Sequence, residues 1–141
     1  MLLGFNHQFV PKILDGTKIH SFRKGNRWKA GNSIQMCTGM RSKAYKQFNE
    51  NIPELQICKS VQECVVQIYT SESDVMYRIG VTIDNRLLLP DNVFLFAWND
   101  GFESLSDCCD WFVEHGTEIY PGIFESKGQI TGDALTFKNV L

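Results

Sequence analysis

The order of the short segments along the chain constrains its fold most, because strands and helices do not alternate. Periodicity and turn residues predict strands over residues 19–23, 33–38 and 130–140, one or two strands within 55–69, a hairpin over 77–89, and helices over 9–14, 90–98 and 104–116. A doubly wound parallel sheet needs a helix between successive strands, and this order does not supply one. The sequence therefore predicts an α+β domain with about six strands in a small β-barrel or curved sheet, flanked by short helices.

Size and composition fit a single domain over residues 1–141. With 43% hydrophobic residues, the chain can bury one core. Its longest apolar run, Val93 to Trp98, is far shorter than the roughly 18 residues that cross a bilayer, and Met1 to Phe5 is too short for the core of a signal peptide. We therefore expect a cytoplasmic protein without a membrane partner.

The cysteines and histidines argue against disulfides and metals. The five cysteines are odd in number and form no CxxC pair; they are Cys37, Cys58, Cys64, Cys108 and Cys109. Reduced and mostly buried thiols are expected. His20 has no second ligand at metal-binding spacing, because His7 and His115 are remote in the sequence. We expect no metal and no cofactor, and a structural or surface role for His20.

Charge is divided sharply between the two parts of the chain. Residues 1–46 contain nine Lys and Arg but one acid, Asp15, for a net charge of +8. Residues 47–141 contain five basic and fifteen acidic residues, for a net charge of −10. Clustered positive charge attracts phosphate-bearing ligands and releases their counterions on binding. The near-neutral total of −2 therefore hides a local cationic surface.

Two motifs stand out within this pattern. Gly16-Thr17-Lys18 precedes a strand that ends at Arg23, with Gly31-Asn32 before the next strand, and Asp100-Gly101-Phe102 precedes a helix. In this order the motifs resemble the ASCH domain, a branch of the PUA-like superfamily, most densely over residues 9–40 and 97–112. The resemblance implies a PUA-like β-barrel with a cleft that receives RNA or a nucleotide.

The resemblance also implies a possible enzyme. Some small bacterial ASCH proteins are similar to amidohydrolases that remove the acyl group from N4-acetylcytidine, and their catalytic positions correspond to Lys18, Ser21 and Asp100. Lys18 would act as the base, Ser21 as nucleophile or water-positioning group, and Asp100 as the orienting acid. Repulsion from Arg23 and Lys24 would lower the pKa of Lys18. Because side chains alternate along a strand, Lys18 must lie in the turn before the strand for this group to converge.

The remaining candidate residues are basic or aromatic. We predict that a nucleotide or nucleic acid contacts Lys18, Arg23, Lys24, Arg27, Trp28, Lys29 and Arg41. The Trp28 ring either stacks on a base or covers one end of the barrel, and the sequence leaves both roles open. Trp98 and Trp111 lie on apolar helix faces and are expected in the core. The polar segments 42–54 and 116–129 are expected to be loops, long enough to gate a cleft.

Three functions follow from these observations. The leading hypothesis is a module that binds RNA or a modified nucleoside or nucleotide in a basic cleft. The first alternative is an amidohydrolase that deacylates N4-acetylcytidine-like nucleosides. The second alternative is a protein-interaction domain whose basic face binds an acidic partner.

Overall fold

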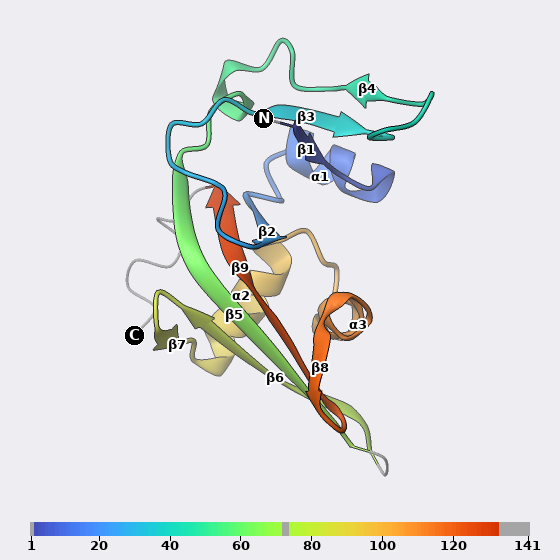
Figure 1. The fold of residues 1–141 in the computed structure, drawn as a ribbon, viewed down its shortest axis with the longest axis vertical. Helices are drawn as coiled ribbons and strands as arrows, with labels where there is room; N and C mark the ends of the chain where they lie inside the picture. Colours follow the sequence, from blue (N-terminus) through green and yellow to red (C-terminus); the bar gives the residue numbers. More distant parts are fainter. Residues whose placement is uncertain (1, 72–73, 133–141) are drawn as a thin grey trace.

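The computed structural model describes residues 2–71 and 74–132, which form an α+β fold of two sheets and three short α-helices (Figure 1). The strands are β1 (Leu2–Gly4), β2 (His20–Lys24), β3 (Gln35–Thr38), β4 (Lys46–Gln47), β5 (Ser60–Ser71), β6 (Asp74–Ile83), β7 (Arg86–Leu87), β8 (Thr117–Tyr120) and β9 (Ile123–Gly132). The helices are α1 (Val10–Leu14), α2 (Pro90–Asn99) and α3 (Leu105–His115), with 3-10 turns η1 (His7–Phe9) and η2 (Pro53–Leu55). The predicted α+β class is confirmed.

The larger sheet forms the main core with α2 and α3. Its strand order is β2-β9-β5-β6-β7, and β8 also pairs with β9. Cys64, Val66 and Ile68 alternate along β5 so that all three face the same core. Phe96 of α2 and Phe112 of α3 pack in that core and are almost fully buried. The period-two pattern of β5 therefore fixes the face on which the helices lie.

The smaller sheet lies at one end of the larger one, together with α1 (Figure 1). β1 is parallel to β3, and β3 is antiparallel to β4. A second core beneath this sheet consists of Leu3, Trp28, Ile34 and Cys58. Among the described residues the sheets form no closed barrel, because β2 and β7 end the larger sheet without pairing to each other. The barrel prediction is therefore replaced by two open sheets.

Several local predictions are confirmed in detail. The hairpin turn has Asp84 and Asn85 in the left-handed region, with φ of 49° and 65°, as tight hairpin turns require. The Ser104 hydroxyl caps α3 by accepting a hydrogen bond from the Asp107 N–H at 3.0 Å. α2 begins with Pro90 in its first turn and ends before Gly101. Local turn chemistry thus sets where these elements begin and end.

The prediction of a loop over residues 116–129 is wrong. This segment forms β8 and most of β9, which pairs with β5 from Ile123 to Gly132. The predicted strand over 130–140 is present as far as Gly132, and residues 133–140 lie outside the described part. The segment 42–54 is only partly a loop, since it contains β4 and most of η2.

A close approach of two strands occurs at Gly128. β9 pairs with β2 there, and a Cβ atom on Gly128 would lie 2.1 Å from the carbonyl oxygen of Arg23. No side chain fits in that space without separating the two strands. The position of Arg23 on β2 therefore depends on a residue without a side chain at 128.

The tryptophans and cysteines refine the picture of the core. Trp98 is 52% exposed, so its predicted core position is wrong, because α2 turns Val93 and Phe96 inward instead. Trp111 packs at the edge of the main core, with its ring centre 4.9 Å from that of Phe112. All five cysteines are free and buried, as expected. Within the described residues, no helix has the length and apolarity needed to cross a membrane.

Candidate functional site

The turn between α1 and β2 directs Lys18 into the protein. The Asp15 carboxylate accepts a hydrogen bond from the Thr17 N–H at 2.8 Å, which tightens this turn. β2 begins only at His20, so Lys18 precedes the strand, as convergence with Ser21 requires. The Lys18 residue is 8% exposed. A lysine so deeply buried needs partners for its ammonium group.

Asp100, at the end of α2, supplies those partners. The Lys18 Nζ donates hydrogen bonds to the carbonyl oxygens of His20, at 3.0 Å, and Asp100. It also lies 3.6 Å from the Asp100 carboxylate, and Asp100 is 5% exposed. Gly101 follows in the left-handed region with φ of 98°, where a Cβ atom would lie 2.9 Å from the Lys18 side chain. A glycine at 101 therefore makes room for the buried ion pair.

His20 and Phe22 complete the environment of the carboxylate. The His20 Nδ1 lies 3.0 Å from the Asp100 Oδ1, and the Phe22 N–H donates to the same oxygen at 3.1 Å. The Asp100 carboxylate thus accepts hydrogen bonds from two groups of β2 and faces the charge of Lys18. This arrangement attaches the end of α2 to the start of β2.

Burial and charge shift the pKa values of this cluster. Burial acts to raise the pKa of Asp100, but the charge of Lys18, the hydrogen bond from His20 and the charge of Arg23 together hold it below its ordinary value. Burial lowers the pKa of Lys18, and the carboxylate of Asp100 opposes that shift. Burial likewise lowers the pKa of His20 against the pull of Asp100. At neutral pH His20 is therefore neutral and donates its Nδ1 proton to the carboxylate.

The pKa shift of His20 predicts loss of stability in mild acid. Because the pKa of His20 is lowered in the fold, only the unfolded chain takes up this proton just below the ordinary value of 6.5. We expect the free energy of unfolding to fall by about 1.4 kcal/mol per pH unit below about pH 6 from this group. The lowered pKa of Asp100 adds a further loss below about pH 4. Urea denaturation across this pH range measures both effects.

A pair of variants tests whether His20 causes the fall in the free energy of unfolding below about pH 6. His20→Asn keeps a donor toward Asp100 and removes the titration, so the slope between about pH 6 and pH 4.5 should flatten. His7→Asn, at an exposed histidine, should leave the slope as it is in the wild type. An unchanged slope in His20→Asn would contradict a neutral, buried His20.

Arg23 differs from Lys18 in having no acidic contact partner. Its Nε donates to the Ser21 hydroxyl at 3.1 Å, and its guanidinium lies 4.7 Å from the centre of the Phe5 ring. Among the described residues, no carboxylate forms an ion pair with it and neither of its Nη groups has a hydrogen-bond acceptor. Burial lowers the pKa of Arg23 to about 10, so the group is charged at neutral pH. A partly buried, charged guanidinium without a contact ion pair can form hydrogen bonds to an anion.

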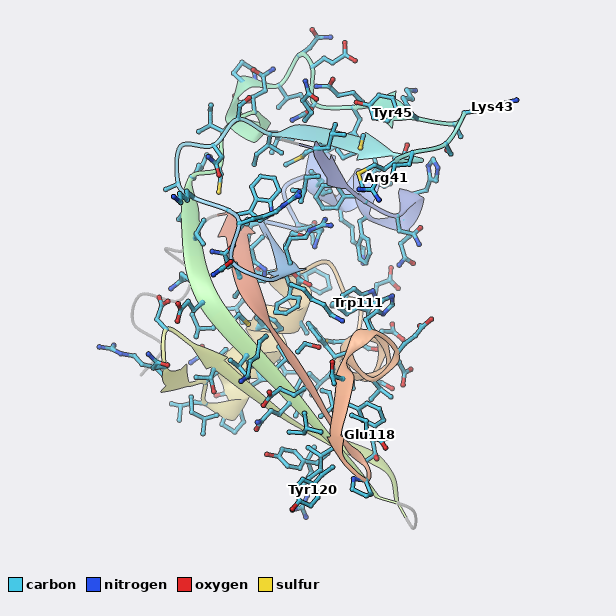
Figure 2. The ribbon with its side chains drawn as sticks, in the orientation of Figure 1. Arg41, Lys43, Tyr45, Trp111, Glu118 and Tyr120 are labelled. Carbon is cyan, nitrogen blue, oxygen red and sulfur yellow. The ribbon has the colours of Figure 1, made fainter. Side chains whose placement is uncertain are left out.

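Arg23 opens into a cavity of about 440 Å³, which we call the Arg23 cavity. Its polar and charged lining consists of Asn6, Lys18, Ser21, Arg23, Lys24, Asp100 and His115, and its aromatic lining of Phe5, Phe9, Phe22, Phe102 and Trp111. The Trp111 and His115 rings stack at 4.1 Å, and Figure 2 shows Trp111 on the side of α3 that faces the small sheet. The cavity thus combines positive charge with aromatic walls.

A second cavity, of about 190 Å³, shares Phe5, Lys18 and Ser21 with the first. We call it the Ile34 cavity, after a residue of its mostly apolar lining. That lining includes Leu3, Ile13, Ile34, Met36, Leu55 and Ile57, with Glu54, Lys59 and Thr131 as polar members. Lys18 and Ser21 therefore stand between a polar, aromatic space and an apolar one.

Five of the predicted site residues line one cavity. Lys18, Ser21, Arg23, Lys24 and Asp100 all contribute to the Arg23 cavity. Lys18 contacts Asp100 directly, but no hydrogen bond joins its Nζ to the Ser21 hydroxyl, which accepts from Arg23 instead. The structure therefore assembles the predicted lysine and acid, and couples the predicted serine to the arginine.

Four predicted contact residues, Arg27, Trp28, Lys29 and Arg41, do not line this cavity. Trp28 is 2% exposed, and Gln129 accepts from its N–H at 3.0 Å and donates to its carbonyl at 3.1 Å. Such burial leaves no ring face for a base. Of the two roles predicted for Trp28, stacking on a base is therefore wrong, and the ring packs inside the protein. Arg27 lies over the Trp28 ring and donates to the Leu2 carbonyl at 3.1 Å. Arg27 and Lys29 are exposed and do not line the cavity.

Sequence reasoning missed several members of the site. His20 was given only a structural or surface role, and Phe5, Phe9 and His115 were not singled out. The partner of His20 is a carboxylate 80 residues away, so spacing alone carried no signal. Phe5 lies within the cationic segment 1–46, and an aromatic residue in such a segment is a usable signal for a ligand site.

Neither a group of metal ligands nor a known relative helps to assign the function of this site. Over residues 2–71 and 74–132, no three or more His, Cys, Asp or Glu side chains are grouped so that they could hold a metal ion. Comparison of the chain with protein-family models, with curated proteins and with solved structures gives no match, and the resemblance to ASCH domains remains a prediction from the sequence.

Proposed function

We propose that this protein binds a nucleotide, free or within RNA, in the Arg23 cavity. The observation that carries the proposal is the unpaired guanidinium of Arg23 among aromatic walls. A guanidinium binds phosphate through two parallel hydrogen bonds, and both Nη groups of Arg23 are available for them. Lys24 adds a second positive charge to the same lining.

The walls of the cavity suit a base. Phe5, Phe9 and Trp111 line the space, and stacking of a base on an aromatic ring contributes about 1–3 kcal/mol. From Gly16 to Asn49 the chain contains no Asp or Glu, so repulsion of a phosphate from this side is small. Charge and stacking together fit a nucleotide better than an uncharged small molecule.

The finer assignment of the fold belongs to the same proposal. An ASCH-like, PUA-like domain would be expected to bring its lysine turn, its arginine-ended strand and its later acidic motif together. Contacts of Lys18 with Asp100, and the place of Arg23 in the same cavity, support that assignment. The open edges of the larger sheet are the feature in which this chain differs from a closed barrel.

Replacing Arg23 tests the proposal. Removing a hydrogen bond to a charged group costs about 1.5–3 kcal/mol, so Arg23→Gln should weaken binding of cytidine 5′-monophosphate about 10- to 100-fold in calorimetric titration at low salt. Arg27→Gln removes the same charge outside the cavity and should change affinity less than about twofold. Equal affinity of Arg23→Gln and the wild type, or no binding by the wild type, would refute the proposal.

Deacylation of N4-acetylcytidine is the second candidate function. The contact of Lys18 with Asp100 favours it, because a buried lysine with a lowered pKa is suited to accept a proton. Two features favour binding instead. The Lys18 ammonium already donates to two carbonyl groups, and Ser21 accepts a hydrogen bond from Arg23 rather than donating to Lys18. If the wild type releases acetate from N4-acetylcytidine and Lys18→Ala does not, the result would support the deacylation function.

A further inference from the structure

A basic hairpin projects beside the Arg23 cavity. We use this name for residues 39–46, the turn that joins β3 to β4 and the first residue of β4. Arg41, Lys43 and Lys46 are exposed there, and no acidic side chain pairs with them in the described part of the chain. Their charges are therefore available to an external ligand.

The turn of the basic hairpin has a defined shape. The Gly39 carbonyl accepts hydrogen bonds from the Ser42 N–H at 3.1 Å and from the Ser42 hydroxyl at 2.7 Å. The same hydroxyl accepts from the Ala44 N–H at 3.1 Å. Arg41 adopts a left-handed φ of 62° within this turn. The cationic side chains are thus presented from a closed, hydrogen-bonded loop, which lowers the entropy lost on binding.

The basic hairpin adjoins the rim of the Arg23 cavity. β3 pairs with β1, whose last residue, Gly4, lines the cavity. The Met40 side chain lies against Gly4, where a Cβ atom would be 3.4 Å from the Met40 Cε. Figure 2 shows Arg41 on the side of β3 toward Trp111, and Lys43 at the outer tip. A ligand that extends from the cavity toward the small sheet therefore passes the charges of Arg41 and Lys43.

A neighbouring hollow of about 420 Å³ is mainly acidic. It shares Phe9, Phe102 and Trp111 with the Arg23 cavity, and its charged lining consists of Asp107, Asp110, Glu114 and the ion pair between Lys12 and Glu103. A polyanion is repelled from this hollow by several carboxylates and attracted by the basic hairpin. The charge distribution therefore favours one direction for a chain of phosphates.

We infer that the ligand is a single-stranded nucleic acid, with one nucleotide in the Arg23 cavity and the adjoining phosphates on Arg41 and Lys43 of the basic hairpin. This inference rests on the proposed function. It extends the ligand from a nucleotide to a polymer that leaves the cavity on the side of the basic hairpin. Phosphate contacts of this kind position the strand without reading its sequence. The basic hairpin is a binding surface separate from the cavity and can be tested separately.

The test compares two double variants that remove equal charge. Arg41→Gln with Lys43→Gln alters the basic hairpin, while Arg86→Gln with Lys127→Gln alters exposed residues on β7 and β9. For a single-stranded RNA of about eight nucleotides, we expect the hairpin variant to bind about tenfold more weakly at low salt. Its slope of log affinity against log salt should fall by about 1.4, since each phosphate contact on a single strand contributes about 0.7. Cytidine 5′-monophosphate should bind both variants like the wild type.

The outcomes separate this inference from the proposed function. Equal RNA affinity and salt slope in the two double variants, with mononucleotide binding intact, would overturn the inference and leave the proposed function standing. Failure of the wild type to bind the mononucleotide would refute the proposed function itself. Tight binding of an oligoglutamate of matched charge would assign the basic hairpin to an acidic protein, and self-association lost only in the hairpin variant would assign it to a second copy. Both results would overturn the nucleic-acid assignment.

Discussion

Replacing Asp100 with alanine is expected to lower the free energy of unfolding by about 3–5 kcal/mol, the cost of leaving a buried charge without its partner. Asp100 is 5% exposed and compensates the ammonium of Lys18, which is 8% exposed. The substitution would also leave the His20 Nδ1 and the Phe22 N–H without their acceptor. Urea denaturation at neutral pH gives the free energy directly.

Further variants distinguish the ion pair from a general effect of substitution. Asp110→Ala, at an exposed position of α3, should change stability by less than about 0.5 kcal/mol. Asp100→Asn keeps an oxygen acceptor but leaves Lys18 uncompensated, so adding Lys18→Met should restore stability rather than reduce it further. Additive losses in that double variant would show that Lys18 and Asp100 act independently, against the contact in the structure.

Trp28→Ala is expected to cost about 3–5 kcal/mol, as for other large aromatic side chains removed from a core. The Trp28 ring, 2% exposed, fills the second core beneath the small sheet. Its main chain is joined to β9 by two hydrogen bonds with Gln129. Loss of the ring therefore removes packing where the segment between β2 and β3 meets the small sheet and the large sheet.

Trp98 provides the matched control. It is 52% exposed on the outer face of α2, so Trp98→Ala should cost less than about 1 kcal/mol under the same conditions. Equal losses at the two positions would contradict the burial of Trp28. Retention of nucleotide binding by a folded Trp28→Leu variant, which has no ring to stack, would in turn indicate that the ring supports the fold rather than stacking on a base.

Local signals predicted the elements that depend on turns and caps. The Ser104 cap, the Asp84-Asn85 turn and Pro90 at the start of α2 each act through neighbours within a few residues, and all appear in the structure. β5 was similarly visible, because Cys64, Val66 and Ile68 alternate toward a single core.

Other features depend on partners that are remote in the sequence. The polar composition of residues 116–129 suggested a loop, yet Ser126 and Gln129 are buried in β9, which pairs with β5 and β2. Trp28 lies between two charged residues, so the sequence left its role open, and its burial depends on packing with Leu3, Ile34 and Cys58. Hydrophobic periodicity carries no information on such contacts.

The candidate site was predictable only through its resemblance to a family. Lys18 and Asp100 are 82 residues apart, and nothing in their local sequence joins them. The alternation rule correctly required Lys18 to precede its strand. The pairing of Ser21 with Arg23 also follows from alternation, since residues two apart share a face.

The close approach of β9 to β2 at Gly128 limits how this sequence can diverge. A methyl group at 128 would meet the Arg23 carbonyl at 2.1 Å, so even alanine would force apart the strand that carries the arginine. Homologues that keep Arg23 in this position should therefore vary little at residue 128, although that residue does not line the Arg23 cavity. A larger residue at 128 in a homologue would indicate a displaced β2.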